Sequence, residues 1–531
     1  MFAQICSALL SRYGTDALSN PHPSGTRIAR AETEAFEALR KQPETMLLSH
    51  RLKNPDAYRK IQKSRREMLL ALLMVKPSPD VLERVRDLIC LICEESTWSA
   101  NAQGIAFEDE NHPSIDFQCA ETAVLLGWTA RLLGEKLDVS TLLRMRSEVR
   151  RRLFKPVLVN DDYDFMNGTA DRPMCIAADL LLSALFLESD ASRAERLVKP
   201  ALKLMDEACR RHGRALAPLE DVVAEISAVT DLVRLIKNYT GDLVDFTKSI
   251  PTNDWLNDIL YPWIRDDIFA NPAGESMQPA LSGSDIFRIA VSADDEQLTH
   301  LGAHLHHRNH QPTATITGRL MELALHDELE NSFGKPKFLR HAALRHNLLM
   351  TARMPGLYSS LHVGGGRANA GDVCLYADSI PVLTDGGDCN YRSLPVLSGR
   401  TQLDVPPLPC FADFDVREDR EIMSVELTRA YPAECNLRSY QRTLMTLRGD
   451  QTVRIMDALD FTEPESVVFR FVTAVRPTIV RTAVRFAPVR MTWEGDFVAT
   501  AIPLDNGLTC VEMTTVEPVQ QAFFAFNFEL T

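Results

Sequence analysis

Apolar residues in the first two-thirds of the chain recur every three or four positions, the period of an amphipathic helix. In residues 79–95 the apolar side chains that fall on one helical face are Val81, Leu82, Val85, Leu88, Ile89, Ile92 and Cys93. The pattern predicts helices over residues 56–76, 79–95, 115–134, 138–154, 172–188, 191–211, 221–239, 253–269 and 313–330. Because each face must be buried against a neighbour, we expect antiparallel helix pairs packed as a bundle, a solenoid or a closed toroid.

From about Gly356 the period changes to two, with β-branched and aromatic residues between turn signals. The runs that predict strands are 356–363, 372–378, 380–385, 420–431, 437–449, 451–461, 465–474, 496–504, 508–516 and 521–530. Strands in such close succession, without helices between them, indicate stacked antiparallel sheets or a β-sandwich. The chain is therefore expected to be all-helical first and all-β second.

Composition narrows the choice of partners. The 531 residues fit two or three domains, and no stretch approaches the ~18 consecutive apolar residues of a membrane helix. A net charge of −14 disfavours nucleic acid and requires a locally basic cleft for any anionic ligand.

Residues 1–14 lack the basic start of a secretion signal and are expected to form a helix. Eleven cysteines, an odd number, favour a reducing, cytoplasmic setting.

A series of phrases, in order over nearly the whole chain, resembles the heparinase II/III-like family. These phrases are ICEESTWS (92–99), IDFQCAETAVLLGWTARLLGEKLD (115–138), LRMRSEVRRRLFKPVL (143–158), LIKNYTG (235–241), SGSDIFRIA (282–290), GLYSSLHVGGGRANAGDVCLYADSIPVLTDGG (356–387) and LPVLSGRTQ (394–402). The resemblance implies an incomplete (α/α) toroid over residues 1–340 and a C-terminal β-sandwich over residues 341–531. It also implies a cleft between them.

The chemistry implied by the resemblance is β-elimination at a uronic acid of an acidic polysaccharide or oligosaccharide. In such a reaction an Asn, Gln or Glu neutralises the sugar carboxylate, and a Tyr or His serves as base and acid. Several members of the family also hold a metal in the sandwich through His and Asp side chains. The matching positions of this chain are therefore the candidate site residues.

In the helical part these positions depart from the family pattern. Trp98 of the cleft phrase is expected to contact substrate, but the histidine that should follow it is Gln103, which is not a base. The neutralising asparagine falls on Asn167 if a gap is allowed and on Asp171 if it is not.

The tyrosine expected before the helix that ends in LIKNYTG is also replaced, because Glu220 or Asp221 stands near its position. Loss of a positioned base typically lowers the rate by ~10²–10⁴. The substitutions therefore predict weak or absent lyase activity, and an active enzyme that uses shifted residues is the alternative.

In the β part the metal-binding histidines are replaced as well. The run GGGRANAG leaves Arg367 and Asn369, the later histidine appears as Arg392, and Asp385 alone remains a plausible ligand. One carboxylate flanked by arginines does not make a zinc site, so no metal or other cofactor is expected. The two arginines are expected either to grip a carboxylate or sulfate group, or to form salt bridges with Asp385.

Other signals have plainer interpretations. His300 and His304 have the i, i+4 spacing of a zinc motif, but the glutamate of a metalloprotease is missing and a surface helix end is expected. The arginines between residues 144 and 155 spread around a helix and are expected to be solvated.

The first hypothesis is thus a lyase-like protein for uronic-acid saccharides. The second is a noncatalytic saccharide-binding protein on the same scaffold. The third is a helical-repeat interaction scaffold with an appended sandwich.

Overall fold

The computed structural model describes residues 52, 54–102, 105, 108–167, 172–211, 217–239, 252–271, 278–337, 340–344, 348–364, 369–384, 391–404, 407, 409, 411–505 and 507–531. The chain divides into two compact units. The helical unit comprises residues 1–212, 223–252 and 281–335, and the β unit comprises residues 213–222, 253–280 and 336–531. The predicted division at residue 340 stays a prediction. The expected helix over residues 1–14 lies outside the described residues.

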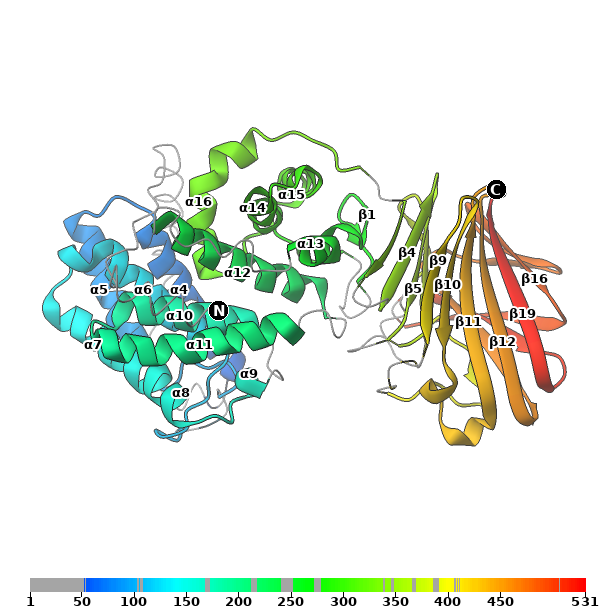
Figure 1. The fold of residues 1–531 in the computed structure, drawn as a ribbon, viewed down its shortest axis with the longest axis horizontal. Helices are drawn as coiled ribbons and strands as arrows, with labels where there is room; N and C mark the ends of the chain where they lie inside the picture. Colours follow the sequence, from blue (N-terminus) through cyan, green and yellow to red (C-terminus); the bar gives the residue numbers. More distant parts are fainter. Residues whose placement is uncertain are drawn as a thin grey trace. The chain divides into compact units, whose positions relative to one another are not determined.

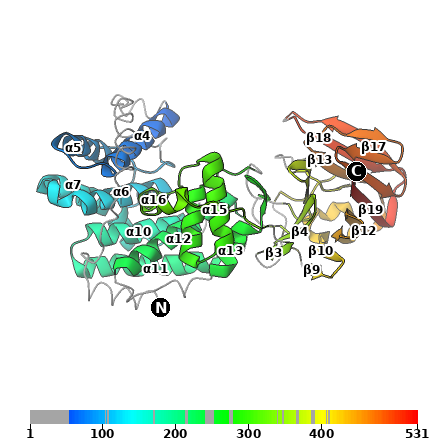
Figure 2. The ribbon, with the colours of Figure 1, turned by 90° about the horizontal axis from the view of Figure 1, so that it is seen from above.

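The described helices are α4 (Pro55–Leu73), α5 (Pro79–Cys93), α6 (Phe117–Leu133), α7 (Val139–Val149), α8 (Lys155–Val159), α9 (Asp164–Asn167), α10 (Pro173–Leu187), α11 (Ala191–Arg211), α12 (Leu219–Tyr239), α13 (Thr252–Leu260), α14 (Gly283–Ala293), α15 (Glu296–Asn309) and α16 (Ile316–Glu330). Short 3₁₀ or π turns follow α6 and α7. The helical first part of the chain is confirmed. Within the helical unit α10 packs against both α6 and α11 (Figure 2).

Helix α5 shows how local sequence sets an element. Ser78 caps it by accepting a hydrogen bond from the Val81 amide, and Pro79 suits the first turn. Val85, Leu88 and Ile89 are buried, as the predicted apolar face requires. Helix α10 is different, because nearly all of its residues are buried and it forms part of the core of the helical unit.

One predicted helix is wrong in its second half. Residues 253–269 were expected to be a single helix, but α13 ends at Leu260 and a hairpin of β1 (Trp263–Arg265) and β2 (Ile268–Phe269) follows. Pro262 explains the break, since it has no amide hydrogen and its ring would clash with the preceding helical turn. This hairpin belongs to the β unit.

The histidines between residues 300 and 310 agree only in part with the expected surface helix end. It lies within α15, where His306 is buried and its Nε2 is 3.1 Å from Oε1 of Glu330. The neighbouring His307 is exposed and stacks on Phe333. The run therefore contributes to packing between α15 and the end of α16.

The remaining described strands are β3 (His341–Leu344), β4 (Leu349–Met354), β5 (Leu357–His362), β6 (Val373–Ala377), β7 (Ile380–Leu383), β8 (Val396–Leu397), β9 (Ala412–Val416), β10 (Arg420–Glu426), β11 (Leu437–Leu447), β12 (Thr452–Glu465), β13 (Val467–Thr473), β14 (Thr478–Val480), β15 (Ala483–Phe486), β16 (Val489–Glu494), β17 (Phe497–Pro503), β18 (Thr509–Thr515) and β19 (Val519–Leu530). Each predicted run contains one of them. The β-rich second part of the chain is confirmed.

These strands form antiparallel sheets that share one core. The sheet orders are β3-β4-β5-β6-β7, β17-β18-β13-β8 and β14-β15-β16-β19-β12-β11-β10-β9. Leu361 of the first sheet, Phe471 of the second and Val453 of the third belong to a single hydrophobic cluster. Figure 1 shows β4 and β5 beside the long strands β10 to β12. Burial of this cluster holds the sheets together.

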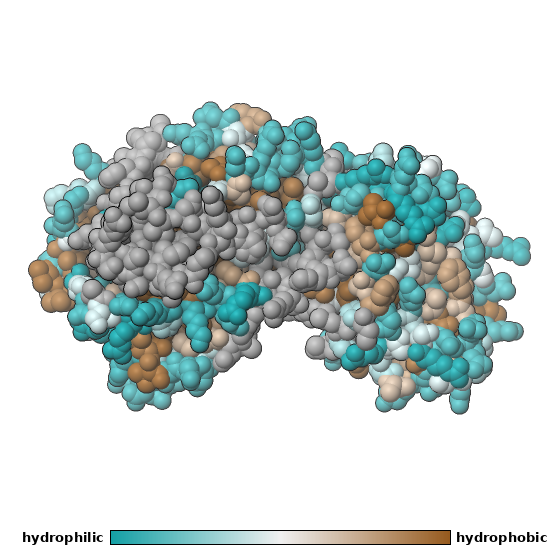
Figure 3. All heavy atoms as spheres, viewed as in Figure 1, coloured by the Kyte–Doolittle hydropathy of each residue, from teal (hydrophilic) through white to brown (hydrophobic). Residues whose placement is uncertain are grey.

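Hydrophilic side chains are prominent on the face of the molecule seen in Figure 3. On the face seen in Figure 3 the described residues are largely hydrophilic, with apolar side chains in small separate groups. Among the helices that the structure describes, none combines the length and apolar character needed to cross a bilayer.

Glu121 of α6 gives the helical unit a predicted pH dependence. Its Oε1 accepts a hydrogen bond of 3.0 Å from the Ile316 amide at the start of α16, and burial raises its pKa from 4.5 to about 7. A raised pKa means that the folded state favours the protonated acid. Its contribution to stability is therefore complete below pH 4.5 and is lost as the pH rises through 7.

Glu121→Gln should therefore stabilise the protein at pH 8 by about 2 kcal/mol and leave its stability at pH 4 nearly unchanged. Denaturant unfolding at the two pH values measures the difference. An equal effect at both values would show that ionisation of Glu121 does not limit stability.

Candidate functional site

The connection between β5 and β6 carries the described part of the predicted site in the β unit. Its ends are fixed by hydrogen bonds: the Gly371 amide donates to the His362 carbonyl at 2.7 Å, and the His362 amide donates to the Asp372 carbonyl at 2.9 Å. Gly371 has φ +82°, and a Cβ there would lie 2.5 Å from Cδ1 of Leu427. Only glycine suits this position.

Asn369 and Arg392 are brought together around Asp372. The Asp372 amide donates to the Asn369 carbonyl at 3.4 Å, and Nη1 of Arg392 is 3.7 Å from Oδ2 of Asp372. Asp372 is itself held by the amides of Val373 and Ser393, at 3.0 and 3.2 Å from its Oδ1. All three clustered side chains are at least nine-tenths buried. The cluster thus combines a guanidinium and a carboxylate, with Asn369 held beside them through its main-chain carbonyl.

A buried ion pair beneath the cluster supports its backbone. Arg442 of β11 donates to both carboxylate oxygens of Asp457 on β12, at 2.7 and 3.1 Å. Its Nη1 donates to the carbonyls of Gly371 and Ser393, at 3.0 and 2.7 Å. Gly371 directly precedes Asp372, and Ser393 directly follows Arg392. Arg442 therefore positions both segments of the cluster.

His362 is a site residue that the sequence reasoning missed. It ends β5, its side chain is fully buried, and neither ring nitrogen has a hydrogen-bond partner among the residues described. Burial, together with the nearby Arg392 guanidinium, lowers its pKa to about 3. The imidazole is therefore neutral at physiological pH and keeps a lone pair. Its place in the phrase GLYSSLHV, just before the glycine run, was the signal available.

The donor set does not fit the metal implied by the family resemblance. The position of the later expected histidine carries the Arg392 cation, whose Nη1 lies 3.7 Å from Oδ2 of Asp372. Within the described ranges, no three His, Cys, Asp or Glu side chains gather closely enough to hold a metal ion. For Arg392, the predicted salt-bridge alternative has a partner, but it is Asp372; Asp385 lies outside the described residues.

In the helical unit Trp98 is buried and acts as a support. Its indole Nε1 donates to the Ile92 carbonyl at 2.8 Å, and the Arg152 guanidinium lies 4.8 Å from its ring centroid. Arg152 is buried as well, an exception to the expected solvation of the basic run, in which Arg144, Arg150 and Arg151 are exposed. The adjacent Glu95 is buried against Arg65 and Arg66 at 3.0 and 2.9 Å. A substrate contact by Trp98 would require its ring to be uncovered.

Glu220 and Asp221 lie in the first turn of α12, and both are partly exposed. Nδ2 of Asn271 donates to Oε2 of Glu220 at 3.3 Å, and the Leu219 amide donates to Oδ1 of Asn271 at 3.0 Å. Glu220 therefore helps to anchor the helix start and carries negative charge near its amides. A catalytic role for either acid stays a prediction.

The other predicted site residues are not placed by the structure. Asn167 is the last residue of α9, and nothing is described of its side chain. Gln103, Asp171, Arg367 and Asp385 lie outside the described residues.

Comparisons with known proteins settle the fold. No protein-family model matches the sequence, and no curated protein matches it. Solved structures do. A structure of heparinase III has a TM-score of 0.58 at 9% identity and covers 99% of this chain and 89% of its own. A structure of a chondroitin AC lyase of Streptomyces coelicolor A3, in complex with chondroitin sulphate, has a TM-score of 0.58 at 10% identity. The alignment covers 99% of this chain and 83% of the lyase. The chain has a polysaccharide-lyase fold.

A mutant of the same chondroitin AC lyase aligns similarly, with a TM-score of 0.55 at 11% identity. The resemblance of the sequence phrases to heparinase II/III-like proteins thus agrees with this lyase fold. Identities near 10% are too low for residue roles to be transferred, so what the site does must be argued from its own groups.

Proposed function

We propose that this chain binds uronic-acid-containing saccharides on a polysaccharide-lyase scaffold and cleaves them by β-elimination weakly or not at all. The observation that carries the proposal is the cluster of Asn369, Asp372 and Arg392 at a position where the family resemblance implies a metal site. A guanidinium offers a fork of donors to a carboxylate or sulfate group. It does not remove a proton from carbon.

The fold neighbours support an acidic polysaccharide as the ligand, since one of them is described with chondroitin sulphate bound. On this proposal the helices form an incomplete (α/α) toroid over residues 1–340, and the sheets form a β-sandwich over residues 341–531. The protein then works in the cytoplasm, without nucleic acid, membrane, metal or other cofactor as a partner.

The test combines binding and turnover on the same samples. The full chain is titrated calorimetrically with uronic-acid tetrasaccharides, sulfated and unsulfated, while parallel mixtures are followed by the ultraviolet absorbance of unsaturated uronate. We expect heat of binding without a sustained rise in absorbance. A rapid rise would contradict the loss of activity, and the absence of binding to any acidic saccharide would contradict the proposal as a whole.

His362 favours a second candidate, an active lyase with relocated groups. A neutral imidazole with a free lone pair could act as the base, and the adjacent Arg392 could neutralise the sugar carboxylate. We rank this second because a base must reach a carbon-bound proton directly, and the imidazole, 1% exposed, is less accessible than Arg392, which is 9% exposed. If absorbance does rise, loss of that rise in His362→Ala would identify this mechanism.

Arg392→Gln tests the binding cluster directly. The substitution removes the charged fork next to Asp372, and we expect the affinity for an acidic tetrasaccharide to fall about tenfold, because a charge-assisted contact is worth about 1.5–3 kcal/mol. Arg485→Gln is the matched control, since Arg485 is an exposed cation on β15, near the opposite edge of the eight-stranded sheet from β10. Equal affinities for both variants would argue against a role for Arg392.

A further inference from the structure

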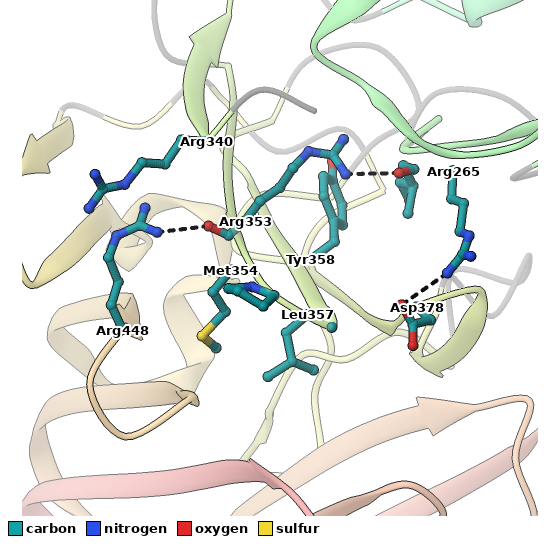
Figure 4. A pocket seen from close by; sticks show the side chains of 11 residues that line it. Arg265, Arg340, Arg353, Met354, Leu357, Tyr358, Asp378 and Arg448 are labelled. Carbon is teal, nitrogen blue, oxygen red and sulfur yellow. Dashed lines mark hydrogen bonds and ion pairs between the residues drawn. The ribbon is translucent and has the colours of Figure 1, made fainter. Parts of the chain in front are cut away.

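A pocket in the β unit is rich in arginine and lies apart from the candidate cluster. Its volume is about 450 Å³, and four guanidinium groups line it: Arg265, Arg340, Arg353 and Arg448. These residues come from separate segments, the β1–β2 hairpin, the residue before β3, strand β4 and the residue after β11. Figure 4 shows Arg340 and Arg448 on one side of the pocket, Arg265 with Asp378 on the other, and Arg353 between them. The volume lies in the range of pockets that hold small ligands.

The topology separates this pocket from the cluster at Asp372. Pro355 and Gly356, in the turn between β4 and β5, line the pocket, whereas the cluster lies beyond the other end of β5. Six residues of strand span about 20 Å at ~3.3 Å per residue. The two places are therefore at opposite ends of the same sheet.

The pocket has an excess of positive charge. Arg265 pairs with Asp378 at 2.9 Å, while Arg448 and Arg340 share the buried Glu421, the latter at 3.7 Å. Arg353 lies over the Tyr358 ring, 4.7 Å from its centroid. Four guanidiniums thus face two carboxylates among the described residues that line the pocket or pair with its lining. In a chain of net charge −14 this is a local attraction for anions.

The arginines are also held in place before any ligand arrives. Nη1 of Arg353 donates to the Ile264 carbonyl at 2.8 Å, and Nη1 of Arg448 donates to the Arg353 carbonyl at 3.0 Å. Nη2 of Arg340 donates to the Glu418 carbonyl at 2.9 Å. Nε of Arg448 is buried and has no hydrogen-bond partner among the described residues. Guanidiniums that are fixed in advance bind an oxyanion at a lower entropic cost than mobile ones.

We propose that the arginine pocket is a second anion-binding site that takes a sulfate or carboxylate group of an acidic saccharide, separately from the cluster at Asp372. The binding of an oxyanion follows from the pocket itself, and only its attachment to a sugar rests on the proposed function. Free inorganic sulfate and a sulfated saccharide share this chemistry, so both serve as probes.

The saccharide arm measures the affinity of the full chain for a sulfated uronic-acid tetrasaccharide by calorimetry at low salt. Arg340→Gln and Arg265→Gln change half-exposed side chains on two sides of the pocket, so the fold should survive both. We expect each to lower the affinity about tenfold, and Arg485→Gln to change it less than twofold. Unchanged affinity in both pocket variants, while the wild-type chain binds, overturns the saccharide part of the proposal.

The sulfate arm compares melting temperatures in sodium sulfate and in sodium chloride of equal ionic strength. Sulfate stabilises proteins generally, so the informative quantity is the difference between variants. We expect the sulfate-specific increase to be smaller in Arg340→Gln than in wild type and unchanged in Arg485→Gln. Equal increases in all three proteins overturn the pocket as an anion site. If the sulfate-specific increase in melting temperature differs between variants as expected but no saccharide binds, the pocket is an anion site and the proposed function is wrong.

Discussion

Asp457→Ala should lower the free energy of unfolding by about 3–5 kcal/mol, the usual result of leaving one partner of a buried ion pair alone. Asp457 is fully buried and accepts hydrogen bonds from Arg442 and from the Tyr440 hydroxyl, the latter at 2.7 Å. Without it, the Arg442 guanidinium keeps its charge in an apolar core, facing only two backbone carbonyls. Differential scanning calorimetry of the full chain measures the loss.

The double variant Arg442→Met, Asp457→Leu is the informative companion. It removes both charges and fills the space, so it should recover most of the stability lost in the single variant. It also removes the donors that hold the carbonyls of Gly371 and Ser393, and should therefore weaken saccharide binding at the cluster. A single variant as stable as wild type would show that the pair contributes little to the fold.

Arg288→Met should destabilise the helical unit by a similar amount, about 3–5 kcal/mol near pH 8. Arg288 is 1% exposed and bonds Asp231 through Nε and Nη2, both at 3.0 Å, while its Nη2 also contacts Asp285. Removing the cation leaves two buried carboxylates, and burial already raises the pKa of Asp231. The main loss of stability then comes from burying two carboxylate charges without a neighbouring cation.

The penalty of Arg288→Met should shrink as the pH is lowered to 5, because Asp231, whose pKa is raised by burial, then takes up a proton more readily. Unfolding at both pH values tests this, with Arg319→Met on α16 as a partly exposed control. A penalty independent of pH would mean that lost packing, and not stranded charge, accounts for the effect.

Periodicity predicted most of the described elements, but no helix was predicted over α14 or α15. Period-two runs marked ten of the strands. The strands β3, β4, β8, β9 and β14 to β16 were missed, and most of them are short. The hairpin after α13 was missed because helical spacing was extended through Pro262, although proline marks a probable stop.

The site was harder to predict because its parts meet through pairing between strands. Arg442 and Asp457 both occupy inward positions of strands that otherwise bury apolar residues, and they are direct partners in the register of β11 and β12. A charged residue at an inward-facing strand position could therefore have predicted a buried ion pair. The arginine pocket gave no such signal, since its four residues come from segments far apart in sequence.

The hydrogen bonds at His362 and Gly371 have a consequence for engineering. They fasten both ends of an eight-residue connection, 363–370, through main-chain groups, while Val363 and Ala370 at its two ends are packed in the core. Doubling the length of such a connection costs only about 0.6 kcal/mol in closure entropy. Foreign peptides, such as a reporter tag or a loop selected from a library, can thus be spliced in while the strands on either side keep their alignment.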